Sequence, residues 1–325
     1  MTDTRNAGAE TRKIAVVYNP AAGGGKAKRR KWLIETALKA YDIPCDLFVT
    51  ESEDHLVETA ESIIHEYPIV VGAGGDTTIN LIATRILVAG TKNALGVIGM
   101  GSVNDLAREL GLFRLKDSLA AVKSGTTCMV DVGVIRAAAH PQPYYFLVSA
   151  SLGLGVAINR YVDDWMRKHK LLSSFRSSTG IPAAMSAIQR AFKTKEVPLK
   201  VTIEAGGESR EVVSALLVIG NISSLAGLFR PSPTASPVTG FLDCCVFEVT
   251  SLANAFQVAF DIKRKKHLEK GEVRIIRDRV FKISSDNPLE FQVDGTIINF
   301  GREAEISLLP KALKMYTGKS CFQAE

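Results

Sequence analysis

Three segments of the chain combine glycine with hydroxyl, amide or carboxylate side chains, and each directly follows a short apolar run. They are residues 19–25 (NPAAGGG), 72–78 (GAGGDTT) and 99–105 (GMGSVND). Glycine lets backbone N–H groups approach an anion closely, and a helix that starts after such a loop favours negative charge at its N-terminus. Each loop alone is equally compatible with a tight turn. The three together indicate a phosphate-binding site.

The first third of the chain alternates β-branched runs with helical periodicity, a pattern typical of right-handed β–α–β units around a parallel sheet. The carboxyl ends of such strands share one edge of the sheet, which gathers the three loops. Neither GxxxxGK[ST] nor GxGxxG occurs, so the sequence does not support a P-loop or a dinucleotide-type Rossmann unit. Strands are predicted at residues 13–19, 45–50, 69–72 and 95–98, and helices at 26–40, 54–65, 77–89 and 105–110.

The pattern changes near Gly125 to short strands separated by turn residues, which indicates an all-β second domain, either a sandwich or an open barrel. Two helical insertions interrupt it, at residues 155–195 with a break at 180–182, and at 253–270. The strands are predicted at residues 126–137, 144–149, 199–205, 211–220, 241–249, 273–277, 280–284 and 289–293.

Composition narrows the class of protein. A chain of 325 residues with 46% hydrophobic side chains suggests two packed domains. Its apolar runs are far shorter than the roughly 20 residues of a membrane-spanning helix, and residues 1–12 are polar, without signal-peptide character, and predicted to be disordered. The five cysteines are odd in number and form no CxxC pair, which argues against a disulfide framework and a zinc site. We therefore expect a cytoplasmic protein.

The order and spacing of the loops resemble the diacylglycerol kinase catalytic-domain family, which includes bacterial lipid kinases and sphingosine kinases. The likeness runs from about residue 13 to 316. Residues 19–23 match the family's NPxxG loop, 74–80 resemble its GGDGTxNE signature, and 101–108 resemble its GTxNDFAR element. Further likenesses lie at residues 149–157, 233–243 and 309–313. Six elements in the same order make this resemblance specific.

The resemblance implies a Rossmann-like parallel α/β nucleotide domain at residues 13–125 and a β-sandwich lipid-substrate domain at 126–304. A segment at 305–325 would return to the first domain, and the reaction would take place between the domains. The implied activity, part of phospholipid metabolism, transfers the γ-phosphoryl group of ATP to a diacylglycerol-like or sphingoid-like hydroxyl with Mg²⁺. The implied ATP-binding residues are Asn19, Pro20, Ala21, Ala22, Gly23, Thr50, Gly74, Gly75, Asp76, Thr77, Thr78, Asn80, Gly101, Ser102 and Asn104.

Four positions depart from the family pattern. Thr77 replaces a glycine, Leu81 a glutamate, and Thr239 an aspartate that helps to hold a structural Mg²⁺, which leaves Asp243 and the Phe241 carbonyl as ligands. The general-base glutamate of the family's DGE motif is Thr296. General-base catalysis typically contributes about 10²–10⁴-fold. The catalytic candidates are Asp76 at the metal–phosphate assembly, Thr296 at the base position, and Asp294 as a substitute base or an ordinary turn residue.

Two basic segments, residues 26–31 and 263–270, indicate what kind of molecule or surface the protein binds. The first is either a solvated face or a functional surface. The second is either a membrane-binding helix or a helix whose apolar residues face the core. We expect a lipid substrate with peripheral association at the inner face of the membrane, and no nucleic acid, because stacking aromatics do not interleave the basic runs. The sequence leaves open whether the protein forms a homodimer. The side chains of Leu171, Leu172, Phe175, Ile181 and Met185 are candidates for an acyl-chain pocket or for core packing.

Two other functions stay open beside the lipid kinase. The four departures are compatible with a catalytically impaired relative that binds nucleotide or lipid without turnover. NAD kinases share a GGDG-type loop and the two-domain plan, so a kinase with a soluble substrate such as NAD is the third hypothesis.

Overall fold

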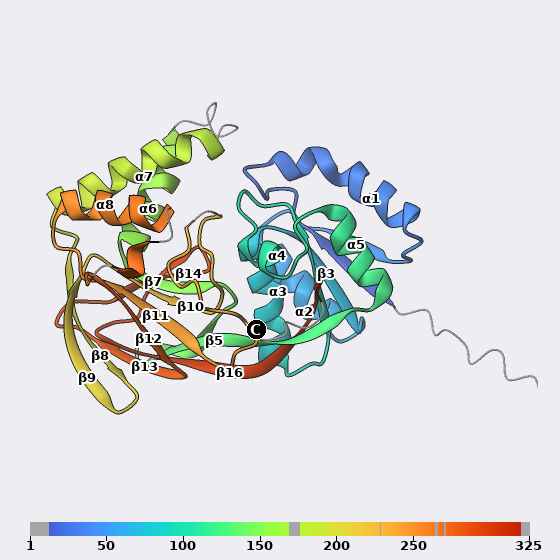
Figure 1. Ribbon diagram of the computed structural model, residues 1–325. Helices are drawn as coiled ribbons and strands as arrows, with labels where there is room; N and C mark the ends of the chain where they lie inside the picture. The colour runs from blue at the N-terminus through green and yellow to red at the C-terminus, as the bar shows by residue number, and fades with distance from the viewer. Residues whose placement is uncertain (1–12, 169–175, 228, 264–265, 270, 320–325) are drawn as a thin grey trace, which may run out of the picture. The chain divides into compact units, whose positions relative to one another are not determined.

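The computed structural model describes residues 13–168, 176–227, 229–263, 266–269 and 271–319, so the predicted disordered stretch 1–12 lies outside it. The described chain forms two compact units (Figure 1). Of the described residues, the first takes 13–101, 110–128 and 313–319. The second takes residues 102–109 and 129–312. The sequence boundary near Gly125 thus differs from this division mainly at residues 102–109, which group with the second unit.

A parallel sheet forms the first unit, in the order β2–β1–β3–β4. All residues of β1 are buried, because this strand lies between β2 and β3. At the other edge, Lys314 and Met315 of β16 pair in parallel with Ala94 and Leu95 of β4. The parallel α/β fold is therefore confirmed. The strands are β1 (Ile14–Tyr18), β2 (Asp46–Val49), β3 (Ile69–Gly74), β4 (Ala94–Gly99) and the end of β16 (Glu303–Tyr316).

The helices of the first unit follow the predicted order with two differences. The helix predicted at 26–40 starts as a 3₁₀ helix before it becomes α1. A further helix, α5, was not predicted, because its N-cap residue is Arg114, which gives none of the usual start signals. The elements are η1 (Lys26–Arg30), α1 (Lys31–Ala40), α2 (Glu53–Ile63), α3 (Asp76–Ala89) and α5 (Leu115–Ser124).

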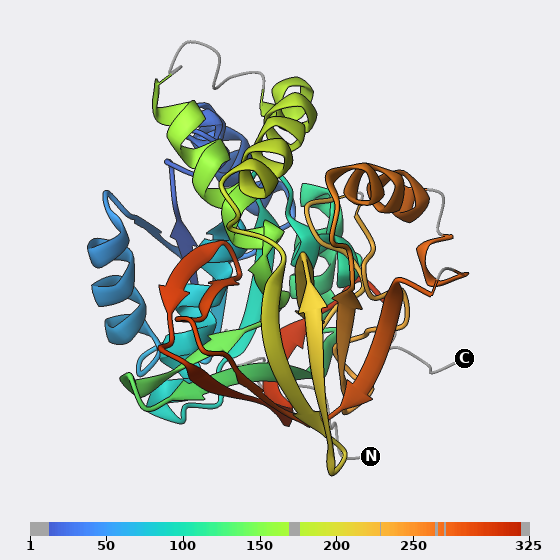
Figure 2. The same cartoon turned by 90° about the vertical axis from the view of Figure 1, so that its left-hand side faces the viewer.

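Two antiparallel layers enclose the core of the second unit, which confirms the predicted β-sandwich. One sheet has the order β12–β11–β10–β7–β14–β15, and in the other β13 pairs with β8 and β16, while β5 pairs with β6 and β16 (Figure 2). Phe291 of the first sheet and Phe281 of the second are fully buried in one apolar cluster. The strands not yet given are β5 (Thr127–Ala137), β6 (His140–Phe146), β7 (Ser149–Gly153), β8 (Leu199–Ala205), β9 (Glu208–Ser214), β10 (Leu216–Gly220), β11 (Leu242–Phe247), β12 (Val273–Asp278), β13 (Val280–Ser284), β14 (Glu290–Val293) and β15 (Thr296–Asn299).

Several predicted bounds in the second unit were wrong. The strand at 144–149 is split between β6 and β7, and the strand at 211–220 is split at Ala215 into β9 and β10. The break predicted at 180–182 does not occur, because α7 runs through it. Pro182 is the seventh residue of α7 and has no backbone N–H to donate within the helix, yet the helix continues past it. The helical elements are α4 (Asp105–Glu109), α6 (Leu154–Lys168), α7 (Arg176–Lys193), α8 (Leu252–Lys263) and η3 (His267–Glu269).

A buried histidine makes the stability of the second unit depend on pH. His267 is buried and lies 3.2 Å from the carbonyl oxygen of Pro231. Burial lowers the pKa of His267, against smaller raising effects of that hydrogen bond and of Asp261. The unfolded chain binds the proton at the ordinary pKa of 6.5. The free energy of unfolding is therefore independent of His267 above about pH 6.5. It decreases as the pH falls below that value, because the unfolded chain takes up the proton first.

We expect a His267→Gln variant, which retains an amide donor for Pro231, to lose less thermal stability between pH 7 and pH 5.5 than the wild type. His65→Gln is the matched control, because His65 is exposed on the first unit. Thermal unfolding monitored by circular dichroism at several pH values provides the measurement. Equal acid destabilisation of the wild type and His267→Gln would contradict the assignment.

Candidate functional site

Asn19 joins the first two glycine loops at the carboxyl ends of β1 and β3. Its backbone N–H donates to the carbonyl oxygen of Ala73 at 3.0 Å, and its side-chain Nδ2 donates to Thr78 Oγ1 at 3.0 Å. Its Oδ1 accepts from the N–H of Ala21 at 2.9 Å, which closes the turn after the strand. One amide side chain thus fixes the first loop and ties it to the second.

Gly23 brings the first loop against the third. It has a φ of 63°, and the next two glycines, Gly24 and Gly25, have φ values of 70° and 83°. A Cβ atom on Gly23 would lie 2.7 Å from the carbonyl oxygen of Met100. Only glycine satisfies both the left-handed backbone and this close approach.

The second and third loops meet in the same way. The carbonyl oxygen of Gly74 accepts from the N–H groups of Met100 at 2.7 Å and Gly101 at 3.2 Å. A Cβ atom on Gly74 would lie 2.4 Å from Thr78 Oγ1, and one on Gly75 would lie 3.3 Å from the Cα of Gly101. The loops therefore pack backbone to backbone where β1, β3 and β4 end.

The N-terminus of α3 begins at this junction. Gly75 is its N-cap and makes no side-chain capping bond, and Asp76 is its first residue. Thr77 replaces the family's glycine in the first turn, is exposed, and does not have a positive φ. A threonine therefore fits the backbone here. The positive end of a helix dipole at the loop junction favours an anion.

Thr50 and Asn80 lie on the elements that flank the loops. Thr50 is buried at the end of β2, and both its N–H and its Oγ1 donate to the carbonyl oxygen of Tyr18, at 3.0 and 3.3 Å. Asn80 lies one turn into α3, where its Oδ1 accepts from Thr84 Oγ1 at 3.4 Å. In this geometry Thr50 supports the end of β1.

The other predicted binding residues of the third loop belong to the second unit. Ser102 is exposed, and Asn104 has a left-handed φ of 57° just before α4. Asp105 is buried, and its Oδ1 accepts from the N–H of Gly227 at 2.9 Å. The bonds of Asp105 thus fix this segment within the second unit, and the described contacts of Ser102 and Asn104 do not test their predicted roles.

Asp294 occupies the turn of the β14–β15 hairpin, with φ values of 44° at Asp294 and 97° at Gly295. Its Oδ2 accepts from the N–H of Leu147 at 2.7 Å, and its Oδ1 accepts from the N–H groups of Val148 at 3.0 Å and Ser149 at 2.9 Å. Three amide donors hold both carboxylate oxygens. This arrangement favours a positioning role for Asp294 over that of a substitute base.

Thr296 is the first residue of β15 and is exposed. The side-chain Nδ2 of Asn159 in α6 donates to the carbonyl oxygen of Gly295 at 2.7 Å, which fixes the turn that precedes Thr296. Of the two roles that the sequence left open for Asp294, the structure shows the turn residue, because Asp294 and Gly295 form the two-residue turn between β14 and β15. The base position is therefore exposed to solvent, next to a turn that a hydrogen bond from α6 holds in place.

The residues at the predicted structural Mg²⁺ site do not fit a divalent cation. Asp243 is buried in β11, and its Oδ1 accepts from Arg277 Nε at 2.7 Å. Its Oδ2 accepts from Arg277 Nη2 at 3.0 Å and from Thr234 Oγ1 at 2.7 Å. The hydrogen bond to this carboxylate raises the pKa of the Arg277 guanidinium. An internal cation already neutralises the carboxylate and uses both its oxygens.

The other two predicted metal ligands also have different partners. Thr239 Oγ1 donates to the carbonyl oxygens of Ser236 at 3.1 Å and Phe241 at 3.4 Å. The ring of Phe241 stacks under Arg279, whose Cζ lies 5.0 Å from the ring centroid. Within the described ranges, no cluster of three or more His, Cys, Asp or Glu side chains is suited to a metal ion. The prediction of Asp243, Thr239 and Phe241 as Mg²⁺ ligands therefore has no support in the geometry.

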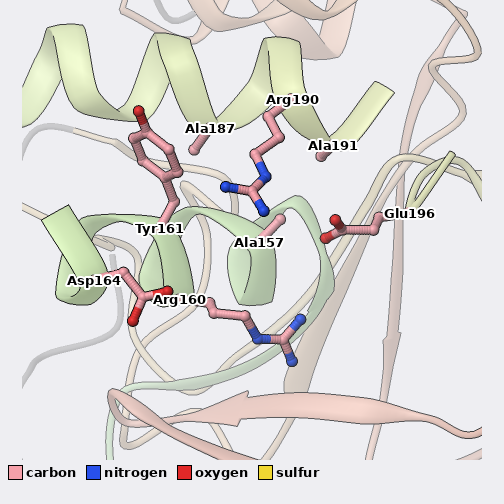
Figure 3. A pocket seen from close by; sticks show the side chains of 8 residues that line it. All are labelled: Ala157, Arg160, Tyr161, Asp164, Ala187, Arg190, Ala191 and Glu196. Atoms are coloured by element: carbon pink, nitrogen blue, oxygen red, sulfur yellow. The ribbon is translucent and has the colours of Figure 1, made fainter. Parts of the chain in front are cut away.

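A small polar pocket lies between α6 and α7 in the second unit. Its volume is about 50 Å³, much less than the ~300 Å³ of a small ligand site. Figure 3 shows Tyr161 of α6 and Arg190 of α7 extending toward the opposite helix. Such a space does not hold an acyl chain. Of the predicted acyl-pocket residues, Leu171, Leu172 and Phe175 lie outside the described residues, and nothing is described of the Ile181 side chain, while Met185 is exposed.

Sequence reasoning missed Arg277 and Asn159. Arg277 belongs to the run VRIIRD of β12, which has no alternating pattern, and its pairing with Asp243 becomes visible only when β11 and β12 are aligned. Asn159 lies in α6 just beyond the family-like segment 149–157, so no motif includes it. The sequence analysis assigned Asp243 to Mg²⁺, and no local signal pointed to an arginine as its cation.

Comparisons with known proteins agree with this architecture. Residues 13–135 match the diacylglycerol kinase catalytic domain, and residues 149–317 match the YegS C-terminal NAD kinase β-sandwich-like domain. Together the two matches cover both units and correspond to the two-domain organisation of the diacylglycerol kinase-like, YegS-like family. The chain belongs to the diacylglycerol kinase catalytic-domain family.

Individual relatives are similar over nearly the whole chain. The diacylglycerol kinase of Staphylococcus aureus (strain MRSA252) is 26% identical over 290 residues, which cover 87% of this chain and 86% of the relative. That of Staphylococcus saprophyticus is 24% identical over 288 residues, which cover 87% and 88%. A solved structure of a diacylglycerol kinase from Bacillus anthracis str. Sterne has a TM-score of 0.69 at 18% identity, covering 94% of this chain and 97% of its own. A further structure from the same organism has a TM-score of 0.73 at 20% identity, with the same coverage.

Proposed function

We propose that this protein is an ATP-dependent lipid kinase that transfers the γ-phosphoryl group to the hydroxyl of a diacylglycerol-like or sphingoid-like lipid. The observation that carries the proposal is the junction of three glycine-containing loops at the N-terminus of α3. Membership of a kinase family supports the reaction class, and the names of the staphylococcal relatives support a diacylglycerol acceptor.

The protein's contribution to such a transfer is to position phosphates and to offset charge. In the proposal, the loops that start at Asn19 and Gly74 cradle the phosphates with backbone N–H groups, and the α3 dipole favours their negative charge. Asp76, the acidic residue at the start of α3, is the side chain that would hold the Mg²⁺ accompanying ATP. When bound, this ion would neutralise phosphate charge.

The β14–β15 hairpin offers no evident base for the acceptor hydroxyl in this proposal. Asp294 is held by three amide donors, and Thr296 is not a base at neutral pH. We therefore expect slow transfer in the wild type. This also keeps the catalytically impaired relative as the second candidate function, because binding without turnover would have the same geometry.

A Thr296→Glu variant is expected to raise the rate of phosphoryl transfer by about 10²–10⁴-fold, the usual contribution of a general base. The exposed position at the start of β15 accepts the longer side chain. Thr296→Gln is the matched control, since it has the same shape without a base, and we expect it to leave the rate near that of the wild type. The rate with saturating ATP is the measurement. An equal increase in both variants would show that the base is not the missing element.

Incubation of the protein with γ-labelled ATP and Mg²⁺ tests the acceptor class. One arm contains vesicles with diacylglycerol, sphingoid base or ceramide, and a parallel arm contains NAD, because the second domain matches an NAD kinase-like sandwich. Labelled lipid is the expected result. Labelled NAD alone would select the soluble-substrate kinase, and ATP binding in calorimetry without labelled product would select the impaired relative.

A further inference from the structure

A large aromatic side chain faces solvent at the start of α1. Trp32 is 65% exposed, and its neighbour Leu33 is 40% exposed. The inner side of α1 is defined by Ile34 and Leu38, which are buried one helical turn apart. Trp32 precedes Ile34 by two positions, a rotation of about 200° around the helix axis. The indole therefore points away from the core that α1 covers in the first unit.

The same segment is strongly basic. Between Lys26 and Ala40 the chain has six basic residues and one acidic residue, Glu35, which gives a net charge of +5. Glu35 pairs with Lys31 at 3.7 Å, with both side chains about half exposed, and such pairs contribute little. The exposed basic residues of η1 and the first turn of α1 are Lys26, Lys28, Arg29, Arg30 and Lys31.

The basic residues of this segment do little to stabilise the fold. Cations near a helix N-terminus oppose the helix dipole, and neither η1 nor α1 has an acidic residue in its first turn. The Tyr18 hydroxyl donates to the carbonyl oxygen of Ala27, which fixes η1 to β1. The basic side chains are thus presented from a fixed backbone, directly after the glycine loop. This combination points to an external partner.

The second basic segment, residues 263–270, follows the apolar residues of α8 and differs from the first. In α8 the apolar residues Val258 and Ile262 are buried in the core of the second unit, so the core interpretation holds for them. The basic residues 264, 265 and 270 lie outside the described residues. In α1, by comparison, the exposed indole is on the side opposite the core. Phe260 of α8 is also 53% exposed, but most of the basic residues near it lie outside the described residues. The first surface is therefore the one in which both the exposed apolar group and the basic side chains are described.

We propose that the η1–α1 surface, from Lys26 to Leu33, docks on a membrane that contains anionic phospholipids. Lysine and arginine are attracted to the negative surface potential of such a membrane, and tryptophan prefers the level of the headgroups. Among the described residues, no helix is long and apolar enough to cross a bilayer. The inference rests on the proposed function in one respect, since a lipid acceptor would be found in the membrane.

The test uses the full chain and vesicles of phosphatidylcholine, with or without phosphatidylglycerol, in the absence of ATP and of any lipid alcohol. Trp165→Phe leaves Trp32 as the one tryptophan, since the chain has two. We expect co-sedimentation and a blue shift of Trp32 emission with anionic vesicles alone. Because no turnover is involved, this result is independent of whether the protein proves to be a kinase.

Charge-reversal variants distinguish binding through this surface from an effect of the protein's net charge. The triple variant Lys28→Glu/Arg29→Glu/Arg30→Glu is expected to weaken binding by about 100-fold or more, and Trp32→Ala is expected to weaken it by roughly tenfold. The control Lys116→Glu/Lys282→Glu/Arg302→Glu has the same net charge at exposed positions elsewhere and should bind like the wild type. Equal losses in both triple variants, no preference for anionic vesicles, or binding to duplex DNA without binding to vesicles would overturn the proposal.

Discussion

An Arg277→Ala variant is expected to lose about 3 kcal/mol of stability and to unfold roughly 6–12 °C below the wild type. The carboxylate of Asp243 is 1% exposed, and Arg277 supplies its cation through two hydrogen bonds. Without the guanidinium, the buried charge retains only Thr234 as a partner among the described side chains. The expected loss lies at the lower end of the range for broken buried pairs, because the arginine side of the pair is 42% exposed.

The same strand provides the control. Arg274 of β12 pairs with Glu248 at 2.9 Å, but both side chains are partly exposed. Arg274→Ala should therefore lose less than about 1 kcal/mol. Because Arg277 fills the cation position, EDTA should not change the melting temperature of the wild type. A wild type that EDTA destabilises, or equal losses in the two variants, would contradict the role assigned to Arg277.

A Gly23→Ala variant is expected to lower the kcat/KM for ATP by about 100-fold. The new Cβ would lie 2.7 Å from the carbonyl oxygen of Met100, so either the first loop or the third must move. A displacement of about 1 Å at a site that positions reactants can reduce the rate by roughly 10². Calorimetric titration with an ATP analogue should show weaker binding in parallel.

Gly25→Ala is the matched control for this loop. Gly25 has a φ of 83°, so alanine meets the same backbone strain as at Gly23. A Cβ atom on Gly25 would have no described heavy atom within 4 Å beyond its chain neighbours, so the loop does not have to move. We expect this variant to retain ATP binding to within a few-fold, because the strain alone is about 1–2 kcal/mol. Equal losses at both glycines would mean that the loop junction does not position the nucleotide.

The fold was predictable where periodicity and turn chemistry agree. The runs that became β1 and β3 are apolar throughout, because they are covered on both faces, and this pattern is visible without a structure. The long strand β16 was missed because Pro310 interrupts it and Lys311 adopts a φ of 50°. Helix α5 was missed because its N-cap gives no signal.

The site was predictable to the level of the loops and not to that of individual partners. The glycines of the first two loops stand in motifs, so their approach could be anticipated, whereas the bond from Asn19 to Thr78 joins residues 59 positions apart. The engagement of Asp294 by Leu147 and its neighbours depends on a pairing of β14 with β7 that no local pattern encodes. The pairing of strands far apart in the sequence therefore determines which carboxylates could act as a base.

The transfer of label from γ-labelled ATP to diacylglycerol in anionic vesicles, measured for the wild type and Gly23→Ala side by side, tests the proposed activity together with the role of the loop junction. We expect labelled phosphatidic acid from the wild type, at a slow rate, and about 100-fold less from the variant. Absence of labelled lipid from the wild type would contradict the proposed activity, and equal labelling by the two proteins would contradict the role of the loop junction.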